Sequence, residues 1–197
     1  MNFSPAAERN KSPIWDILSG KISDAKLALE IASGTGQHAL FFASHSPSIT
    51  WQPSDMSDDN FTQIDMQKAT MKLPNVNSPI IIDCEKPDTW PSISPDLILV
   101  SNMIHISPWE ATKGLFTLSG RLLLEGKTLC TYGPFIQEGV ETAPSNLSFD
   151  QSLRSRNPAW GIRNLTEVQK LAQEHGFSTD SVHNMPANNL LILFKKQ

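Results

Sequence analysis

A loop of small residues next to an acidic side chain offers the clearest chemistry in the sequence. In the segment LALEIASGTGQHALFFAS an apolar run ends at Glu30, and Gly34 and Gly36 follow before a helix-like run begins. Such a loop presents backbone N–H groups and a helix N-terminus to a nucleotide-like ligand. Its GTGQHA portion also fits the dinucleotide fingerprint, and Asp55 stands roughly twenty residues further on, where that fold holds an acid for the ribose. A dinucleotide is therefore one candidate ligand.

Carboxylates at the ends of successive apolar runs favour a different ligand. Glu30, Asp55 and Asp83 each stand at such an end, and open α/β sheets bind ligands outside the carboxyl ends of their strands. A carboxylate beside a pyrophosphate is unfavourable because like charges repel in a low-dielectric cleft. S-adenosylmethionine instead carries an ammonium and a sulfonium and no phosphate. We expect Asp55 to bind its ribose hydroxyls and Asp83 its adenine amino group, although each aspartate taken singly could equally be a cap or turn residue.

Two side chains are candidates for catalysis of methyl transfer. His105 lies in NMIHISPW after the fourth apolar run, and its ordinary pKa of ~6.5 suits a general base. A core histidine bonded to the backbone is an equally good explanation. Tyr132, the only tyrosine, ends the fifth run and is expected to face the same crevice, with structural packing slightly favoured as its role. The segment differs from the N-P-P-Y and D-P-P-Y signatures of methylation on nucleic-acid bases or protein glutamine, which disfavours those acceptors.

Arginines in SLRSRNP are candidates for substrate binding. Two guanidinium groups, those of Arg154 and Arg156, could clamp a carboxylate or phosphate on a small substrate. Salt bridges to Asp150 or Glu138 are the alternative. Trp160, together with Phe149, is expected to form part of the pocket wall.

Both ends of the chain offer further candidates. The ERNK segment is expected to fold over the cofactor and to bring Arg9 or Asn10 near its carboxylate. Asn188 in PANN could reach the rim of the site, although a turn role is favoured.

Continuous apolar runs alternate with helix-length amphipathic segments, which predicts a doubly wound α/β sheet. The expected strands are Lys26–Ala32, Ile49–Gln52, Pro79–Cys84, Pro95–Ser101, Gly126–Tyr132, Ser181–His183 and Leu190–Phe194. The expected helices are Pro13–Ile22, Gly36–Ser44, Asp58–Leu73, Pro108–Leu124 and Thr166–His175. Only NMPANN separates the last two strands, so we expect them to form an antiparallel hairpin.

Local signals refine this arrangement. In SPWE, Ser107 is the predicted N-cap and Glu110 its capping-box partner. Asn164 is the predicted N-cap of the last helix, and Gly176 is placed to end it. Residues 1–12 and residues 133–163 do not fit the alternation, and irregular segments of this length are usually lids or binding loops. We expect them to cover a single domain that spans residues 1–197.

Length, charge and cysteine content limit the functions that the protein can have. A chain of 197 residues fits one domain, and a net charge of −4 argues against a broad nucleic-acid-binding face. Cys84 and Cys130 lie outside any C-x-x-C pattern, so we expect free thiols on buried strands and no metal site. The polar N-terminus and the absence of a membrane-length apolar run predict a cytoplasmic protein.

Motifs along nearly the whole chain resemble one family. LEIASGTG is similar to motif I of class I S-adenosylmethionine-dependent methyltransferases, with Ala32 in place of the first glycine. The segments SPAAERNKSPIWDIL, WQPSD, NMIHISPW, YGPF, SNLSFDQSLRSRNPAWGIRN and MPANNLLILFKK resemble the small methyltransferase-like family of unknown substrate that includes methyltransferase-like protein 26.

The resemblance implies a seven-stranded sheet in the order 3-2-1-4-5-7-6, with strand 7 antiparallel and helices on both faces. It also implies that Glu30 approaches the methionyl ammonium, that Gly34 and Gly36 admit the cofactor, and that Asn102 contacts its methionyl end. The expected function is methyl transfer from S-adenosylmethionine to a small molecule, which can be anionic, without nucleic-acid or membrane partners. A regulatory module that binds the cofactor without catalysis and, less favoured, a nicotinamide-dependent oxidoreductase are the alternatives.

Overall fold

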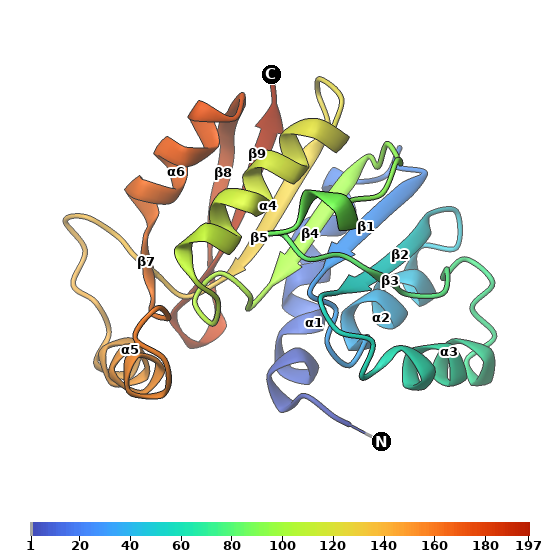
Figure 1. Cartoon of the computed structure of the whole chain (residues 1–197), viewed down its shortest axis with the longest axis horizontal. Coiled ribbons are helices and arrows are strands. Elements are labelled where there is room, and N and C mark those ends of the chain that lie inside the picture. Colours follow the sequence, from blue (N-terminus) through green and yellow to red (C-terminus); the bar gives the residue numbers. More distant parts are fainter. Residues whose placement is uncertain (1) are drawn as a thin grey trace.

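In the computed structural model, which describes residues 2–197, one seven-stranded sheet forms the centre of the chain (Figure 1). Its strands are β1 (Leu27–Ile31), β2 (Thr50–Asp55), β3 (Ile80–Ile81), β4 (Leu97–Ser101), β5 (Thr128–Gly133), β8 (Phe177–Met185) and β9 (Asn189–Lys196). The order is β3-β2-β1-β4-β5-β9-β8, and β9 runs antiparallel to both β5 and β8 while the other pairs are parallel. The predicted sheet order and the antiparallel hairpin are therefore confirmed.

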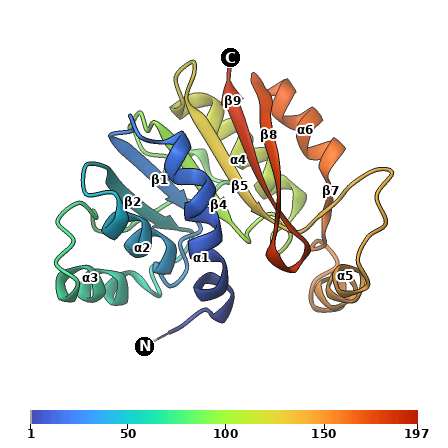
Figure 2. The same cartoon turned by 180° about the vertical axis from the view of Figure 1, so that it is seen from behind.

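Helices cover both faces of this sheet. They are α1 (Pro5–Leu18), α2 (Gln37–His45), α3 (Phe61–Thr70), α4 (Trp109–Leu122), α5 (Pro144–Arg156) and α6 (Leu165–Glu174). Helices α4 and α6 lie in front of the sheet in Figure 1, and the view from behind in Figure 2 brings α1 and α2 to the front. In residues 2–197 no helix combines the length and the apolar character that crossing a membrane requires.

The carboxyl ends of the parallel strands meet at one edge of the sheet, the lower edge in Figure 1. Helix α5, the first turns of α1 and the turn between β8 and β9 lie at the same edge. Since side chains from distant parts of the chain converge there, this edge is where a ligand site of an open α/β sheet is expected.

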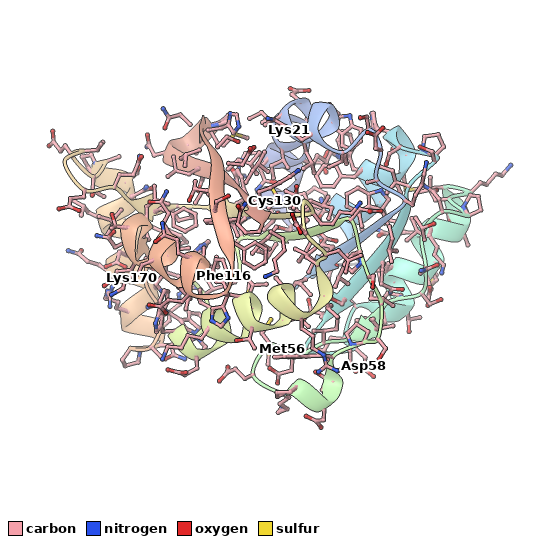
Figure 3. All side chains as sticks on the ribbon, turned by 90° about the horizontal axis from the view of Figure 1, so that it is seen from above. Lys21, Met56, Asp58, Phe116, Cys130 and Lys170 are labelled. Carbon is pink, nitrogen blue, oxygen red and sulfur yellow. The ribbon has the colours of Figure 1, made fainter. Side chains whose placement is uncertain are left out.

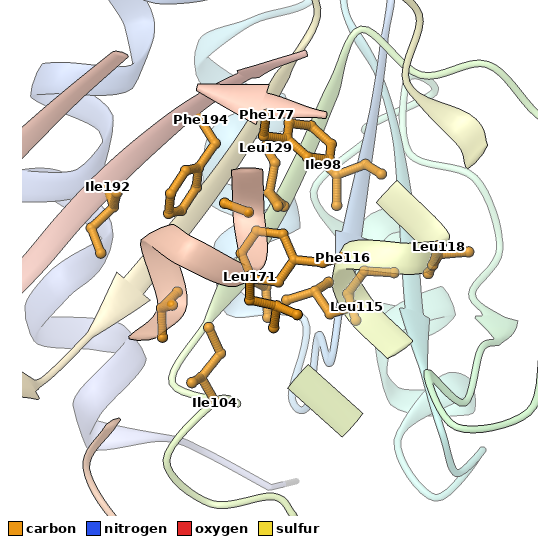
Figure 4. Close-up of a cluster of buried hydrophobic side chains, with 14 of the residues drawn as sticks. Ile98, Ile104, Leu115, Phe116, Leu118, Leu129, Leu171, Phe177, Ile192 and Phe194 are labelled. Atoms are coloured by element: carbon orange, nitrogen blue, oxygen red, sulfur yellow. The ribbon is translucent and has the colours of Figure 1, made fainter. Parts of the chain in front are cut away.

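Aromatic and aliphatic side chains fill the space between the sheet and helices α4 and α6 (Figure 4). Phe116 of α4 is fully buried, and its ring makes edge-on contacts with Phe177 and Phe194 at centroid distances of 6.2 and 5.5 Å. On α6, Val168 and Leu171 are buried at helical spacing and give that helix its apolar face. This packing fixes α4, whose first turn borders the site described below.

A second cluster lies on the other face, where α1 and α2 pack against β1, β2 and β5. Fully buried members include Ile14 and Leu18 of α1 and Trp51 of β2. Cys130, labelled in the view of Figure 3, belongs to this cluster, and Cys84 belongs to the first. Both are buried free thiols, as expected, but only Cys130 lies on a strand, because β3 ends at Ile81 and the expected strand Pro79–Cys84 is too long. Burial raises the pKa of Cys84 to about 12.

The N-terminal segment differs from the prediction. Helix α1 begins at Pro5, so residues 5–12 are helical and the expected start at Pro13 is wrong. Ser4 is the N-cap, and its Oγ accepts a hydrogen bond from the Ala7 N–H at 3.2 Å. Pro13 lies inside the helix, where a missing N–H forgoes one backbone hydrogen bond. The burial of Ile14 and Leu18 supports the helix across that position.

Residues 133–163 are also more regular than predicted. They contain α5 and the short strand β6 (Phe135–Ile136), which pairs in parallel with β7 (Arg163–Asn164). The weak apolar periodicity of α5, in which only Asn146 and Leu153 are buried, explains why the sequence pattern did not reveal it. The expected strand Ser181–His183 is likewise longer, from Phe177 to Met185.

Two predicted helix caps have different outcomes. Asn164 caps α6 as expected, since its Oδ1 accepts a hydrogen bond from the Thr166 N–H at 2.8 Å. The capping box at α4 is wrong, because Pro108 occupies the N-cap position and no side chain caps the helix. Glu110 instead pairs with Lys113 at 2.8 Å.

Candidate functional site

A cavity of about 580 Å³ lies at the carboxyl ends of β1, β2 and β4, within the size range of small-molecule sites. Five residues expected from the sequence line it: Gly34, Asp55, Asp83, Asn102 and Trp160. They come from the last residue of β2, from the loops after β1, β3 and β4 and from the segment after α5. The parallel sheet therefore brings together side chains that are far apart in the sequence.

The glycine loop has the backbone conformation that the motif predicts. Gly34 and Gly36 have φ values of +53° and +76°, in the left-handed region that favours glycine. A Cβ on Gly36 would stand 2.6 Å from Cγ1 of Ile64 in α3. Gly36 is absent from the cavity lining, so its role is to let the loop pack against α3. Ala32, in place of the first glycine, keeps a left-handed φ of 56°.

Asp55 holds the loop and borders the cavity at the same time. Its Oδ2 accepts a hydrogen bond from the Gly34 N–H at 2.8 Å, and its Oδ1 accepts one from the Met56 N–H at 2.8 Å. Each carboxylate oxygen has a second lone pair, so this carboxylate can still accept hydrogen bonds from a ligand in the cavity.

Asp83 is fixed by its own loop. Lys86 pairs with it at 2.8 Å, and the Glu85 N–H donates to its Oδ1 at 2.9 Å. Burial raises the pKa of Asp83, but these two hydrogen bonds outweigh burial and hold that pKa below its usual range. Helix α4 presses on this loop at Gly114, where a Cβ would stand 2.0 Å from the carbonyl oxygen of Cys84. Close packing of α4 therefore positions the aspartate.

Glu30 lies behind the cavity rather than in its wall. The side chain is 1% exposed, its Oε2 has no hydrogen-bond partner among the described residues, and Glu30 is absent from the lining. Burial raises its pKa to about 8, against opposing hydrogen bonds from Ser33 and the Ala39 backbone. With this raised pKa the carboxyl is protonated and neutral at pH 7.

His38, which sequence reasoning missed, lines the cavity in contact with Glu30. Its Nδ1 lies 3.6 Å from Oε1 of Glu30, and its Nε2 lies 2.6 Å from Oδ1 of Asn10. The short contact is a hydrogen bond if Nε2 carries the proton. Burial lowers the pKa of His38 to about 4, so the ring is neutral at pH 7. Its position in the first turn of α2, directly after the glycine loop, is the sequence feature that could have identified it as a cavity residue.

The two expected catalytic side chains lie outside the cavity lining. His105 is 4% exposed, contacts the Phe149 ring at a centroid distance of 5.5 Å, and has its pKa lowered to about 4 by burial. Tyr132 does not face this crevice, because it shares the face of β5 that packs on α1 with Cys130. Burial raises its pKa and outweighs the opposing influence of the Asn10 and Asn189 side chains.

The arginines of the predicted substrate clamp have other partners. Arg154 pairs with Asp150 at 2.8 Å, which is the alternative that the sequence left open. Arg156 lies over the Trp160 ring at 5.6 Å, so it supports a residue of the cavity wall. Arg9 is exposed on α1 and does not line the cavity, and Asn10 reaches it only through His38.

Further lining residues were not expected. Ser4 and Ala7 show that α1 covers the cavity, and Met103 and Ile106 add apolar surface from the loop after β4. Ser101 and Ser107 also line the cavity, and their buried hydroxyls have no hydrogen-bond partner among the described residues. Ser4 is a helix cap, and Met103, Ile106 and Ser107 lie in the segment between β4 and α4, where apolar periodicity carries no information.

The charge of the lining is acidic. Asp55, Asp83 and Glu85 contribute carboxylates, and neither lysine nor arginine lines this cavity. In the described residues, no group of three or more His, Cys, Asp or Glu side chains is arranged to hold a metal ion. The cavity thus suits a ligand that is neutral or cationic near the glycine loop.

Several solved structures with the same fold carry the name of methyltransferases. An O-methyltransferase family protein from Burkholderia thailandensis matches with a TM-score of 0.81 at 13% identity, over 96% of this chain and 57% of that chain. The mitomycin 7-O-methyltransferase MmcR matches with a TM-score of 0.81 at 14% identity, over 95% of this chain and 54% of that chain. Human N-acetylserotonin methyltransferase in complex with SAM matches with a TM-score of 0.75 at 14% identity, over 96% of this chain and 54% of that chain. The chain thus spans a little over half the length of these proteins, and the similarity establishes the fold.

The sequence also matches a family profile over nearly its whole length. The profile carries the description "Protein of unknown function (DUF938)" and covers residues 1–196. The chain therefore belongs to the DUF938 family, with a methyltransferase-like fold.

Proposed function

We propose that this protein is an S-adenosylmethionine-dependent methyltransferase that acts on a small-molecule acceptor. The observation that carries the proposal is the acidic cavity, with Asp55 and Asp83 at the ends of neighbouring strands and no lysine or arginine in its lining. A dinucleotide would bring a pyrophosphate into that acidic lining, which is unfavourable. The methyltransferases of the same fold and the motif resemblance to the methyltransferase-like protein 26 family support the same ligand.

The residues present fit this cofactor. Asp55 would accept hydrogen bonds from the ribose hydroxyls while it holds Gly34, and Asp83 would accept one from the adenine amino group. Glu30 contacts His38 of the lining, and a cationic methionyl group beside His38 would favour ionisation of this buried carboxyl. When bound, the cofactor supplies a methyl group activated by its sulfonium. Trp160 and the other apolar lining residues exclude water from the acceptor.

Calorimetric titration with S-adenosylmethionine and with S-adenosylhomocysteine tests the cofactor. We expect saturable micromolar binding of both, weakened at least about tenfold by Asp55→Asn, because an amide cannot replace the carboxylate toward two ribose hydroxyls. Asp58→Asn is the matched control, since Asp58 is exposed beyond β2 (Figure 3) and does not line the cavity. The control should bind like the parent protein.

Two results would contradict the proposal. One is a folded protein that binds neither compound. The other is tighter binding of a nicotinamide dinucleotide in the same titration, which would favour an oxidoreductase. A positive result leads to a second assay, in which labelled cofactor and a metabolite extract are incubated with the protein and new methylated products are identified by mass spectrometry.

A regulatory cofactor-binding module is the second candidate function. One observation favours it: both expected catalytic side chains, His105 and Tyr132, lie outside the cavity lining. Under this alternative, no methylated product forms in the extract although the cofactor binds. Appearance of a product that Asp55→Asn diminishes would exclude it.

A further inference from the structure

A second pocket, of about 210 Å³, lies between the first turn of α5, the 137–143 loop and the turn joining β8 to β9. Amide side chains dominate its polar lining, and we call it the amide pocket; they are Gln137, Asn146, Asn184, Asn188 and Asn189. Neither lysine, arginine nor histidine lines it, and Glu141 is its one carboxylate. It shares no lining residue with the larger cavity.

Hydrogen bonds fix one side of the amide pocket and leave the other side available. Asn146 is 8% exposed and donates from Nδ2 to the Asn188 carbonyl at 2.9 Å. Asn188 in turn donates to Ser145 Oγ at 3.2 Å. The side chains of Gln137 and Asn184 make no hydrogen bond within residues 2–197. Two whole amide groups can therefore serve a ligand without breaking internal contacts.

The chemistry of this lining selects an uncharged ligand with many hydroxyl groups. Each amide offers both an N–H donor and a carbonyl acceptor, and each hydroxyl needs both. An anion would meet Glu141 with no cationic side chain to compensate. Phe135, Met185 and Leu190 give the pocket an apolar floor against which the C–H face of a sugar ring can pack.

The amide pocket is a site separate from the larger cavity, because the two share no lining residue. From its lining chemistry we propose that the amide pocket binds an uncharged polyhydroxylated compound of carbohydrate type. This proposal goes beyond the proposed function, which concerns the larger cavity.

Side-chain amide NMR signals of the full-length protein provide the test. The probes are glucose, galactose, mannose, N-acetylglucosamine, ribose and myo-inositol, added singly, and glucose 6-phosphate as the anionic comparison. We expect saturable shifts of the Gln137 and Asn184 side-chain signals with at least one neutral probe. Asn184→Ala should weaken that binding about tenfold, because two hydrogen bonds to the ligand are lost. Gln173→Ala, an exposed amide on α6, should leave it unchanged.

The outcomes separate the two proposals. Failure of every neutral probe to give saturable shifts overturns the amide pocket as a carbohydrate site, and so does tighter binding of glucose 6-phosphate than of glucose. Neither result bears on cofactor binding, which calorimetry measures separately and which Asn184→Ala should preserve. Sugar binding without cofactor binding would support the amide pocket as a carbohydrate site and contradict the proposed methyltransferase function.

Discussion

The buried carboxyl of Glu30 should give folding stability a pH dependence above pH 6.5. Glu30→Gln replaces it with a neutral amide of nearly the same shape. Because burial raises the pKa of Glu30 from 4.5 to about 8, the folded chain binds this proton more tightly than the unfolded chain. The stability that this group contributes is complete below pH 4.5 and is lost as the pH rises toward 8.

The magnitude follows from proton linkage. Within this window the free energy of unfolding falls by as much as ~1.4 kcal/mol per pH unit, so the parent protein should lose about 2 kcal/mol between pH 6.5 and pH 8. His38 acts at lower pH, because its pKa is lowered from 6.5 to about 4 and its contribution is lost only as the pH falls below 6.5. The window above pH 6.5 therefore isolates Glu30 from its neighbour.

Urea unfolding followed by circular dichroism at pH 6.5, 7.0, 7.5 and 8.0 measures the effect. The Glu30→Gln variant should show a nearly flat profile where the parent protein loses stability. Glu138→Gln, which changes an exposed loop carboxyl, should follow the parent. Parallel profiles for the parent and Glu30→Gln would refute the reasoning, since they would mean that Glu30 ionises in the folded protein as it does in water.

Three backbone positions give further predictions. Gly36→Ala should lower the free energy of unfolding by about 1–3 kcal/mol, because its Cβ would meet Ile64 and its φ is left-handed; unchanged thermal stability would contradict this. Gly114→Ala should lower the free energy of unfolding by about 3 kcal/mol or more, because the new Cβ would clash with the backbone carbonyl of Cys84. Cofactor titration of this variant should show weaker binding, because the loop that carries Asp83 would shift. Ala32→Gly should leave the free energy of unfolding unchanged or raise it by up to about 1 kcal/mol in urea unfolding. Glycine relieves the strain of the left-handed φ, but it also increases the entropy of the unfolded chain. A clear loss of stability would contradict this and show that the Ala32 methyl packs favourably.

The fold was predictable because its signals are local. Continuous apolar runs marked the parallel strands, and the short NMPANN connection allowed only a hairpin. The start of α1 and the whole of α5 were missed because their apolar periodicity is weak and because Pro13 has the pattern of a helix start. In both places tertiary contacts, rather than local sequence preference, stabilise the helix.

The sequence by itself determined the strands, the terminal hairpin, the glycine loop and the acids at the strand ends, because apolar runs and loop motifs depend on residues close together in the chain. The sheet order was implied by the resemblance to the methyltransferase-like family and not by these local patterns. Only the tertiary structure decided which side chains reach the cavity. Glu30 and Tyr132 stand on the strand faces covered by α1 and α2, while His38 reaches the cavity from α2. Whether a residue at a strand end is exposed to a ligand or covered depends on the helix packed over it, and that packing joins segments distant in sequence.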